Sequence, residues 1–208
     1  MDQADLNIQV GLPEHLRRDA ARLYLEAFGA KLGRLLGTGE RAAAFLADAL
    51  RPPQSIVALN GRGDLVGVLG FHNENGGFVG GDYALLQRRY GAPGAAWRYL
   101  ALSLFERAPL PGEMLLDGVV VAPGARGAGV GGLLLRAAAA EARAQRFGAI
   151  RLDVVFENHG ARRLYERHGF REVAKTRRPI VGRIFGFAGA TTMRLSVSET
   201  PSAQSSHN

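Results

Sequence analysis

The spacing of apolar residues along the chain changes between the two-residue period of a strand and the longer period of a helix. Alternating apolar and polar residues predict a short strand over Asn7–Val10. From Pro13 onward the apolar residues recur on one side of a helical turn, as in an amphipathic helix packed on a sheet. A second helix is predicted over Glu40–Leu50, because two prolines follow it directly.

Strand patterns dominate the rest of the chain, with one strong helix among them. A hairpin is predicted from Gln54–Leu59 and Leu65–Phe71, which flank a turn rich in Asn, Gly and Asp. The later predicted elements are the strand Leu115–Val121, the helix Leu133–Phe147, and the strands Ile150–Phe156, Arg171–Thr176 and Thr191–Val197. We expect one domain over residues 1–197, and a disordered polar tail over 198–208.

A long segment, residues 73–112, separates the second strand of the hairpin from the next strand. Asp82 is placed to cap a short helix that starts at Tyr83. A stronger helix follows, and its apolar stripe should be buried; the stripe consists of Trp97, Leu100, Ala101, Leu104 and Phe105. The segment is therefore a helical pair packed on the domain, a cap over a binding site, or a dimer surface.

The composition excludes several classes of protein. The chain has 208 residues, of which 47% are apolar, and this is enough for one substantial core. It has no apolar run of membrane-spanning length, and its first residues lack the pattern of a signal peptide. Because it has no cysteine, it has neither disulfides nor a thiol nucleophile. We therefore expect a cytoplasmic protein without membrane association.

The formal net charge of +7 raises the question of nucleic-acid binding. The basic residues are almost all arginines, scattered along the chain, and no helix-turn-helix or zinc pattern accompanies them. We expect no nucleic-acid partner. The positive field could steer a polyanionic ligand, or it could simply be a solvated basic surface.

The most informative stretch lies between the strand Leu115–Val121 and the helix after it. A turn leads into the glycine cluster Gly127–Gly132, which opens the helix. The first N–H groups of a helix are unpaired, and glycines let a ligand approach them closely. Strand, glycine turn and helix N-terminus together predict an anion site, most often one for phosphate.

A dinucleotide-binding fingerprint is one reading of this stretch, because Gly127, Gly129 and Gly132 have its spacing and Asp153 lies downstream. Three features argue against it. The first glycine does not follow the strand directly, and Asp153 lies inside a predicted strand rather than at its end. Too little strand–helix alternation flanks the motif for a doubly wound sheet.

A second reading matches two blocks in order. The first is Val121-x-Pro123-x-x-Arg126-Gly127-x-Gly129-Val130-Gly131, and the second is Asn158-x-x-Ala161-x-x-Leu164-Tyr165-x-x-x-Gly169-Phe170. Together they resemble the GNAT superfamily of acyl-CoA-dependent N-acetyltransferases. The resemblance implies an α/β fold of the GNAT type, with a mixed central sheet of six to seven strands flanked by helices. The segment at 73–112 would then be a helical insertion between the third and fourth strands.

The resemblance also implies a ligand and its binding residues. Acetyl-CoA would be the acyl donor, with its pyrophosphate on the N–H groups of the turn and its pantetheine arm beside the strand before it. The side chain of Arg126 would contact the pyrophosphate or stabilise the turn. The expected cofactor-binding residues are Val119, Val120, Val121, Arg126, Gly127, Ala128, Gly129, Val130, Gly131, Gly132, Asn158, Ala161 and Tyr165.

Catalysis would need a proton donor and a base. The resemblance assigns Tyr165 as the general acid that protonates the departing CoA thiolate; the alternative is that Tyr165 is a half-buried core residue. The resemblance assigns Asn158 as a cofactor contact, and the alternative is a plain helix cap. By position, Asp117 and Glu113 are the best candidates for the base that deprotonates an amine, before His72 and Glu74. His159 and His168 do not make a metal pair, so no metal is expected.

The expected activity is acetyl transfer from acetyl-CoA to a primary amine in a ternary complex. Acidic residues around the insertion favour a small cationic amine; they are Glu74, Asp82, Glu106, Glu113 and Asp117. The alternative is a non-catalytic acyl-CoA-binding sensor or regulatory module. A homodimer is a further possibility, suggested by the apolar stripe of the insertion.

Overall fold

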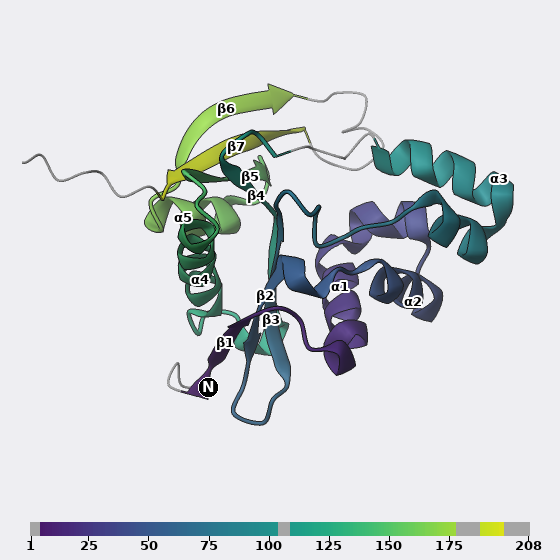
Figure 1. Cartoon of the computed structure of the whole chain (residues 1–208), viewed down its shortest axis with the longest axis horizontal. Helices are drawn as coiled ribbons and strands as arrows, with labels where there is room; N and C mark the ends of the chain where they lie inside the picture. Colours follow the sequence, from purple (N-terminus) through teal and green to yellow (C-terminus); the bar gives the residue numbers. More distant parts are fainter. Residues whose placement is uncertain (1–4, 104–108, 178–187, 198–208) are drawn as a thin grey trace, which may run out of the picture.

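The computed structural model describes residues 5–103, 109–177 and 188–197, and the account below refers to them (Figure 1). Seven strands form one sheet in the order β1-β2-β3-β4-β5-β7-β6. In chain order the elements are β1 (Asn7–Val10), α1 (Arg17–Leu36), α2 (Glu40–Ala49), β2 (Ser55–Leu59), β3 (Leu65–His72), α3 (Tyr83–Ser103), β4 (Glu113–Val121), α4 (Val130–Ala144), β5 (Ala149–Val155), α5 (His159–Arg167), β6 (Arg171–Arg177) and β7 (Gly189–Ser196). The predicted mixed sheet of six to seven strands flanked by helices is confirmed.

The sheet opens in its middle. Strands β1 to β4 pair in antiparallel fashion, as do β5, β7 and β6, and the parallel pair β4–β5 joins the two halves. That parallel pairing covers only Glu113–Leu115 of β4 against Ala149–Arg151 of β5. Beyond it both strands continue without pairing to each other, so their facing edges leave a gap in the backbone hydrogen bonds.

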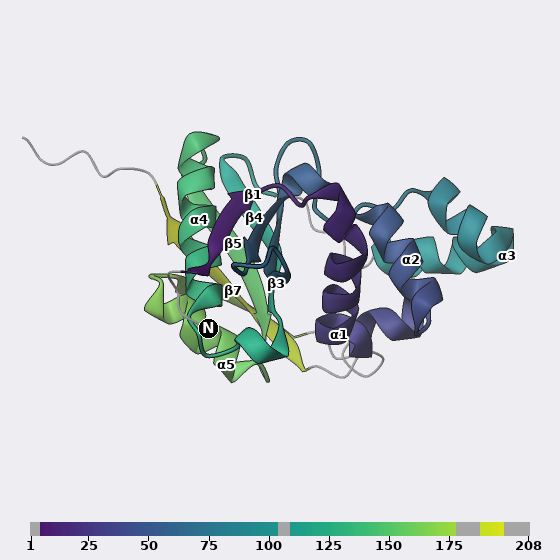
Figure 2. The same ribbon diagram turned by 90° about the horizontal axis from the view of Figure 1, so that it is seen from below.

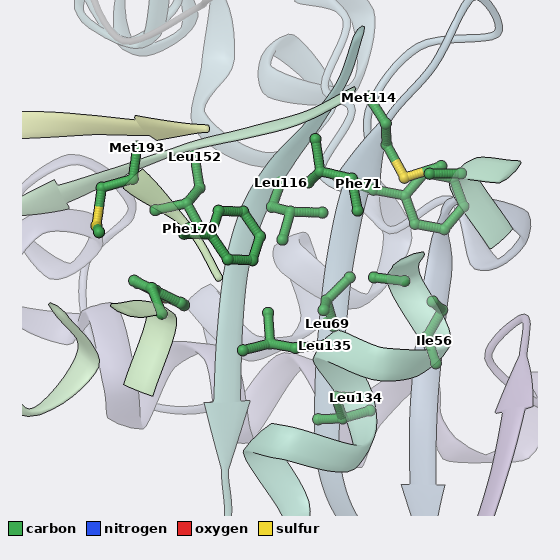
Figure 3. Packing of buried hydrophobic residues seen from close by; sticks show 14 of the residues in the cluster. Ile56, Leu69, Phe71, Met114, Leu116, Leu134, Leu135, Leu152, Phe170 and Met193 are labelled. Atoms are coloured by element: carbon green, nitrogen blue, oxygen red, sulfur yellow. The ribbon is translucent and has the colours of Figure 1, made fainter. Parts of the chain in front are cut away.

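Helices cover both faces of the sheet. Helices α4 and α5 lie on one face, and α1 lies on the other with α2 and α3 beyond it (Figures 1 and 2). The larger core cluster packs α4 against the sheet, and Figure 3 shows Leu134 and Leu135 of α4 facing Leu69 and Leu116. A second cluster packs α1 and α2 on the opposite face, including Leu16, Tyr24, Leu46 and Phe78.

Helix α1 runs unbroken through Gly29 and Gly33. A glycine inside a helix costs about 1 kcal/mol relative to alanine. Burial of Leu35 and Leu36 at the end of α1, in a cluster with α2 and α3, offsets this cost.

The segment between β3 and β4 contains α3, which has a break at Gly91 where φ is 71°. Its first part packs on α1 and α2 through Leu85 and Leu86, and the cap by Asp82 is present because Leu85 N–H donates to Asp82 Oδ1 at 2.6 Å. Within the single chain two residues of the predicted stripe are not covered, since Trp97 is 46% and Leu100 68% exposed. After the break the helix instead buries Ala95.

Leu104 and Phe105, which complete the predicted stripe, lie outside the described residues, as does the predicted tail from Ser198 to Asn208. Within the described residues, no helix is both long and apolar enough to cross a membrane.

Candidate active site

A β-bulge at Asp117 shapes the centre of the open edge. In the antiparallel register, Gly70 lies opposite Gly118 and Phe71 lies opposite Leu116, so Asp117 is the extra residue. Before the bulge, Met114 and Leu116 point to the α4 face. After it, Val120 points to the α1 face. The alternation before the bulge places Asp117 on the α1 face, and the bulge shifts the alternation after it, so that Val120 also points to the α1 face.

The Asp117 carboxylate has two partners. Its Oδ1 lies 3.1 Å from Nε2 of His72, at the end of β3. Its Oδ2 accepts a hydrogen bond from the Phe78 N–H at 3.0 Å. Both side chains of the pair are about four-fifths covered, at 21% exposure for His72 and 19% for Asp117. This arrangement fixes a carboxylate and an imidazole side by side where β4 leaves β5.

Tyr24 of α1 reaches the same bulge. Its hydroxyl donates to the Gly118 carbonyl at 3.4 Å, and a side chain at Gly70 or Gly118 would crowd it or the neighbouring Phe28. Burial raises the pKa of Tyr24 well above its ordinary value, and the Asp117 carboxylate and Tyr165 raise it further, although the Gly70 amide acts in the opposite direction. The three groups are thus close enough to interact electrostatically.

Three aromatic side chains pack together near the Asp117–His72 pair. The Tyr24 ring contacts Phe28 and Phe78, with ring centroids 5.2 and 5.3 Å apart. The sequence placed Tyr24 only on the apolar side of a helix and did not single out Phe28 or Phe78. No local motif marks these three residues, because only the fold brings α1 and the loop after β3 to the bulge of β4.

The main chain of β4 offers hydrogen-bonding groups toward the gap. Ala122 N–H donates to the Val66 carbonyl of β3 at 2.9 Å. In an antiparallel pair the bonding direction alternates, so Val120 also faces β3, whereas Val119 and Val121 direct their N–H and C=O groups toward β5. Since β5 does not pair there, the strand pairing leaves the groups of Val119 and Val121 available, although the Val121 carbonyl also accepts from the Arg126 side chain.

The turn after β4 presents a set of unpaired amides. Gly127 and Gly129 both have φ of 81°, a left-handed conformation that favours glycine. The amides of Arg126 and Ala128 are used inside the turn. Within the described part of the chain, no acceptor is present for the amides of Gly127, Gly129, Val130, Gly131 and Gly132. These donors converge at the start of a 15-residue helix and form an anion site.

The last two glycines of the cluster also have a packing role. A Cβ on Gly131 would lie 3.0 Å from Leu164, and one on Gly132 would lie 2.7 Å from the ring of His168. Their small size lets α5 approach the N-terminus of α4. The Arg126 side chain donates through Nε to the Val121 carbonyl at 3.2 Å, so it stabilises the turn while its terminal nitrogens stay exposed.

Helix α5 carries the remaining predicted residues. Asn158 is its cap, since Oδ1 accepts from the Ala161 N–H at 3.1 Å. Tyr165 is buried, contacts Phe170, and has no hydrogen-bond partner for its hydroxyl among the described residues. Burial raises the pKa of Tyr165 to about 12. The hydroxyl therefore keeps its proton at neutral pH.

Glu113 is separate from this group. Its Oε1 accepts from Arg194 at 2.6 Å, and its Oε2 lies 3.7 Å from Arg151, while its side chain is 12% exposed. Two guanidinium groups thus face this carboxylate within the sheet. Asp82 is occupied as a helix cap. Of the acidic residues named from the sequence, Asp82, Glu113 and Asp117 thus have separate partners, and Glu106 lies outside the described residues.

An opened sheet edge that ends in a helix N-terminus, with a tyrosine and a carboxylate near it, suits a strand-like ligand that carries phosphate. A sequence model described as the acetyltransferase (GNAT) family matches residues 15–170. The chain belongs to this family, and it is an acyl-CoA-dependent acetyltransferase whose donor is acetyl-CoA.

Solved structures have the same fold. One acetyltransferase superposes with a TM-score of 0.61 at 24% identity, covering 92% of this chain and 100% of its own. A GCN5-related N-acetyltransferase from Kribbella flavida gives 0.59 at 18% identity, covering 93% and 98%. yncA from Salmonella typhimurium, a putative acetyltransferase with its cofactor acetyl-CoA, gives 0.60 at 17%, covering 97% and 99%. No curated protein sequence matches the chain significantly.

Proposed function

We propose that the protein transfers the acetyl group of acetyl-CoA to a primary amine by direct attack in a ternary complex. The observation that carries this proposal is the unpaired edge of β4, which ends at a helix N-terminus with five free amides. No other part of the described chain combines a strand edge with an anion site in this way.

The donor site fits a long ligand with a diphosphate at one end. The free amides after Ala128 suit phosphate oxygens, and a Cβ built at Gly127 meets nothing within 4 Å, so a ligand can approach the turn closely. The N–H and C=O groups of Val119 and Val121 suit the amides of a pantetheine arm, in the manner of an added strand. Acetyl-CoA supplies the activated thioester when bound there.

Asp117 is the base in this proposal. A primary amine has a pKa of about 10, so at neutral pH it must lose a proton before it can attack. Asp117 lies at the bulge of β4, where β4 and β5 no longer pair, and the His72 ring and the Phe78 amide contact its carboxylate. Glu113 is a weaker choice, because both of its oxygens face arginines.

Tyr165 is the proton donor for the departing thiolate. Its hydroxyl is protonated at neutral pH and has no acceptor within the described part of the protein. Tyr165 and Asp117 both act electrostatically on Tyr24, so the proposed acid and the proposed base lie near the same tyrosine. One group takes a proton and the other gives one.

The test combines binding and turnover on the same preparation. Titration calorimetry with CoA should show binding, and incubation with acetyl-CoA and a panel of primary amines should release free thiol in proportion to the acetylated amine. CoA binding without transfer to any amine would contradict the enzymatic proposal and favour a sensor. Failure to bind CoA would overturn both.

A further inference from the structure

A pocket of about 450 Å³ lies between the end of α2 and the start of α3, apart from the donor site. Two short segments form its wall, because Arg51 N–H donates to the Phe78 carbonyl at 2.8 Å and Gly80 N–H donates to the Ala49 carbonyl at 2.9 Å. Arg51, Arg88 and Arg89 contribute side chains to the lining. The pocket is therefore built on paired backbone and is rich in guanidinium groups.

The loop after β3 holds Arg51 in place. A Cβ on Gly80 would lie 2.5 Å from the Arg51 Nε, and a Cβ on Gly76 would overlap its guanidinium group. Any side chain at these two positions would expel Arg51 from its place. The absence of side chains at Gly76 and Gly80 thus leaves room for the guanidinium group beside the pocket.

The charges in the pocket are unbalanced in favour of an anion. Asp48 is paired with Arg89 at 2.8 Å, and Asp82 accepts from the Leu85 amide. Across residues 5–103, 109–177 and 188–197, neither Arg51 nor Arg88 has a side-chain hydrogen bond or an ion pair. A guanidinium group binds carboxylate or phosphate through two parallel hydrogen bonds, so these two arginines suit such a group.

The pocket is close to the proposed base. A Cβ built on Gly77 would overlap the His72 ring. A Cβ built on the preceding residue, Gly76, would overlap the Arg51 guanidinium group. Consecutive Cα atoms are about 3.8 Å apart, so the guanidinium group lies within about 11 Å of the imidazole that contacts Asp117. This distance is about the length of three extended residues.

We propose that this pocket binds the anionic end of the acceptor. The acceptor would be an amine that also carries a carboxylate or phosphate, with the amine at Asp117 and the anion at Arg51 and Arg88. This inference rests on the function proposed above and narrows the acceptor class. It also replaces the expectation of a purely cationic amine, because arginines outnumber aspartates three to two in the pocket lining.

The test compares triglycine with triglycinamide, which have the same amine and length but differ in the terminal carboxylate. The wild-type protein should favour triglycine in kcat/KM by about 10- to 100-fold, the range expected for a charge-assisted hydrogen bond. Arg51→Gln and Arg88→Gln should each reduce this preference while the KM for acetyl-CoA stays the same. Arg18→Gln, an exposed arginine of α1, is the matched control and should keep the preference.

Thermal unfolding of each variant shows whether it folds, and Arg51→Lys, which keeps the charge, should keep part of the preference. Equal turnover of both acceptors by the wild type would overturn the inference and leave the proposed function intact. If no amine is acetylated, the proposed function fails. Calorimetry with triglycine then still tests the pocket, because Arg51→Gln must abolish the binding of triglycine. Activation by inorganic phosphate without competition against triglycine would indicate an effector site and overturn the acceptor assignment.

Discussion

The glycine turn allows a test with two glycines of one loop, Gly124 and Gly127, that differ in the sign of φ. A Cβ added to Gly124 or to Gly127 meets no atom within 4 Å. Gly127 has φ of 81°, whereas Gly124 does not have positive φ. Gly124→Ala and Gly127→Ala therefore add the same methyl group to the same loop, and only the second strains the backbone.

The strain sets the size of the effect. An alanine in the left-handed conformation costs about 1–2 kcal/mol. If the turn keeps its shape, this lowers the melting temperature by about 2–8 °C for a chain of this length. If the turn relaxes, the Gly127 amide no longer points at the anion site, and loss of one hydrogen bond to a charged oxygen weakens CoA binding about 10- to 100-fold.

Titration calorimetry with CoA and thermal unfolding separate these outcomes. Gly124→Ala should match the wild type in both measurements, and Gly127→Ala should fall short in at least one. Pantetheine, which has no diphosphate, should bind both variants equally. The reasoning about the turn is refuted if Gly127→Ala has wild-type stability and wild-type affinity for CoA.

Three further predictions follow from the centre of the site. Tyr165→Phe removes only the hydroxyl, so kcat should fall about 100-fold with CoA affinity unchanged; wild-type turnover in a thiol-release assay would remove Tyr165 from the mechanism. Asp117→Asn should lower kcat/KM about 100-fold without loss of CoA binding, whereas Glu74→Gln should have no effect on the same assay; equal rates for the two variants would exclude Asp117 as the base. Because the pKa of Tyr165 is about 12 in the folded protein and about 10 in the unfolded chain, the unfolded state loses this proton first as the pH rises. The contribution to stability is thus complete below pH 10 and declines between about pH 10 and 12, by up to about 1.4 kcal/mol per pH unit. Urea unfolding across this range should show a shallower decline in Tyr165→Phe, and an identical slope would contradict the assigned pKa.

The donor half of the site could be predicted because it is local in the chain. The turn residues from Arg126 to Gly132 are consecutive, and the block from Asn158 to Phe170 is a single helix with its flanks. Their spacing fixes which amides and side chains face a ligand. The start of α4 was placed three residues too late, at Leu133 instead of Val130, because its first turn consists mainly of glycines that pattern analysis assigns to a loop.

The acceptor half could not be predicted in the same way. A β-bulge leaves no mark on the spacing of apolar residues in β4, so the pairing of Asp117 with His72 was one option among several. Glu113 looked equivalent to Asp117 until the fold brought Arg194 of β7 against it. The stripe at Trp97 and Leu100 showed which residues share a helix face, but not whether another element covers that face.

The sequence by itself determined the class of fold, the glycine turn that presents amides to an anion, and the tyrosine and asparagine of α5. Each of these depends on residues that are near one another in the chain, where backbone geometry alone sets their relation. Only the tertiary structure decided the opening between β4 and β5, the environment of each carboxylate, and the meeting of Arg51 with the loop after β3. These features arise from contacts between residues far apart in the chain, and their energies depend on burial and distance, which a linear pattern does not contain.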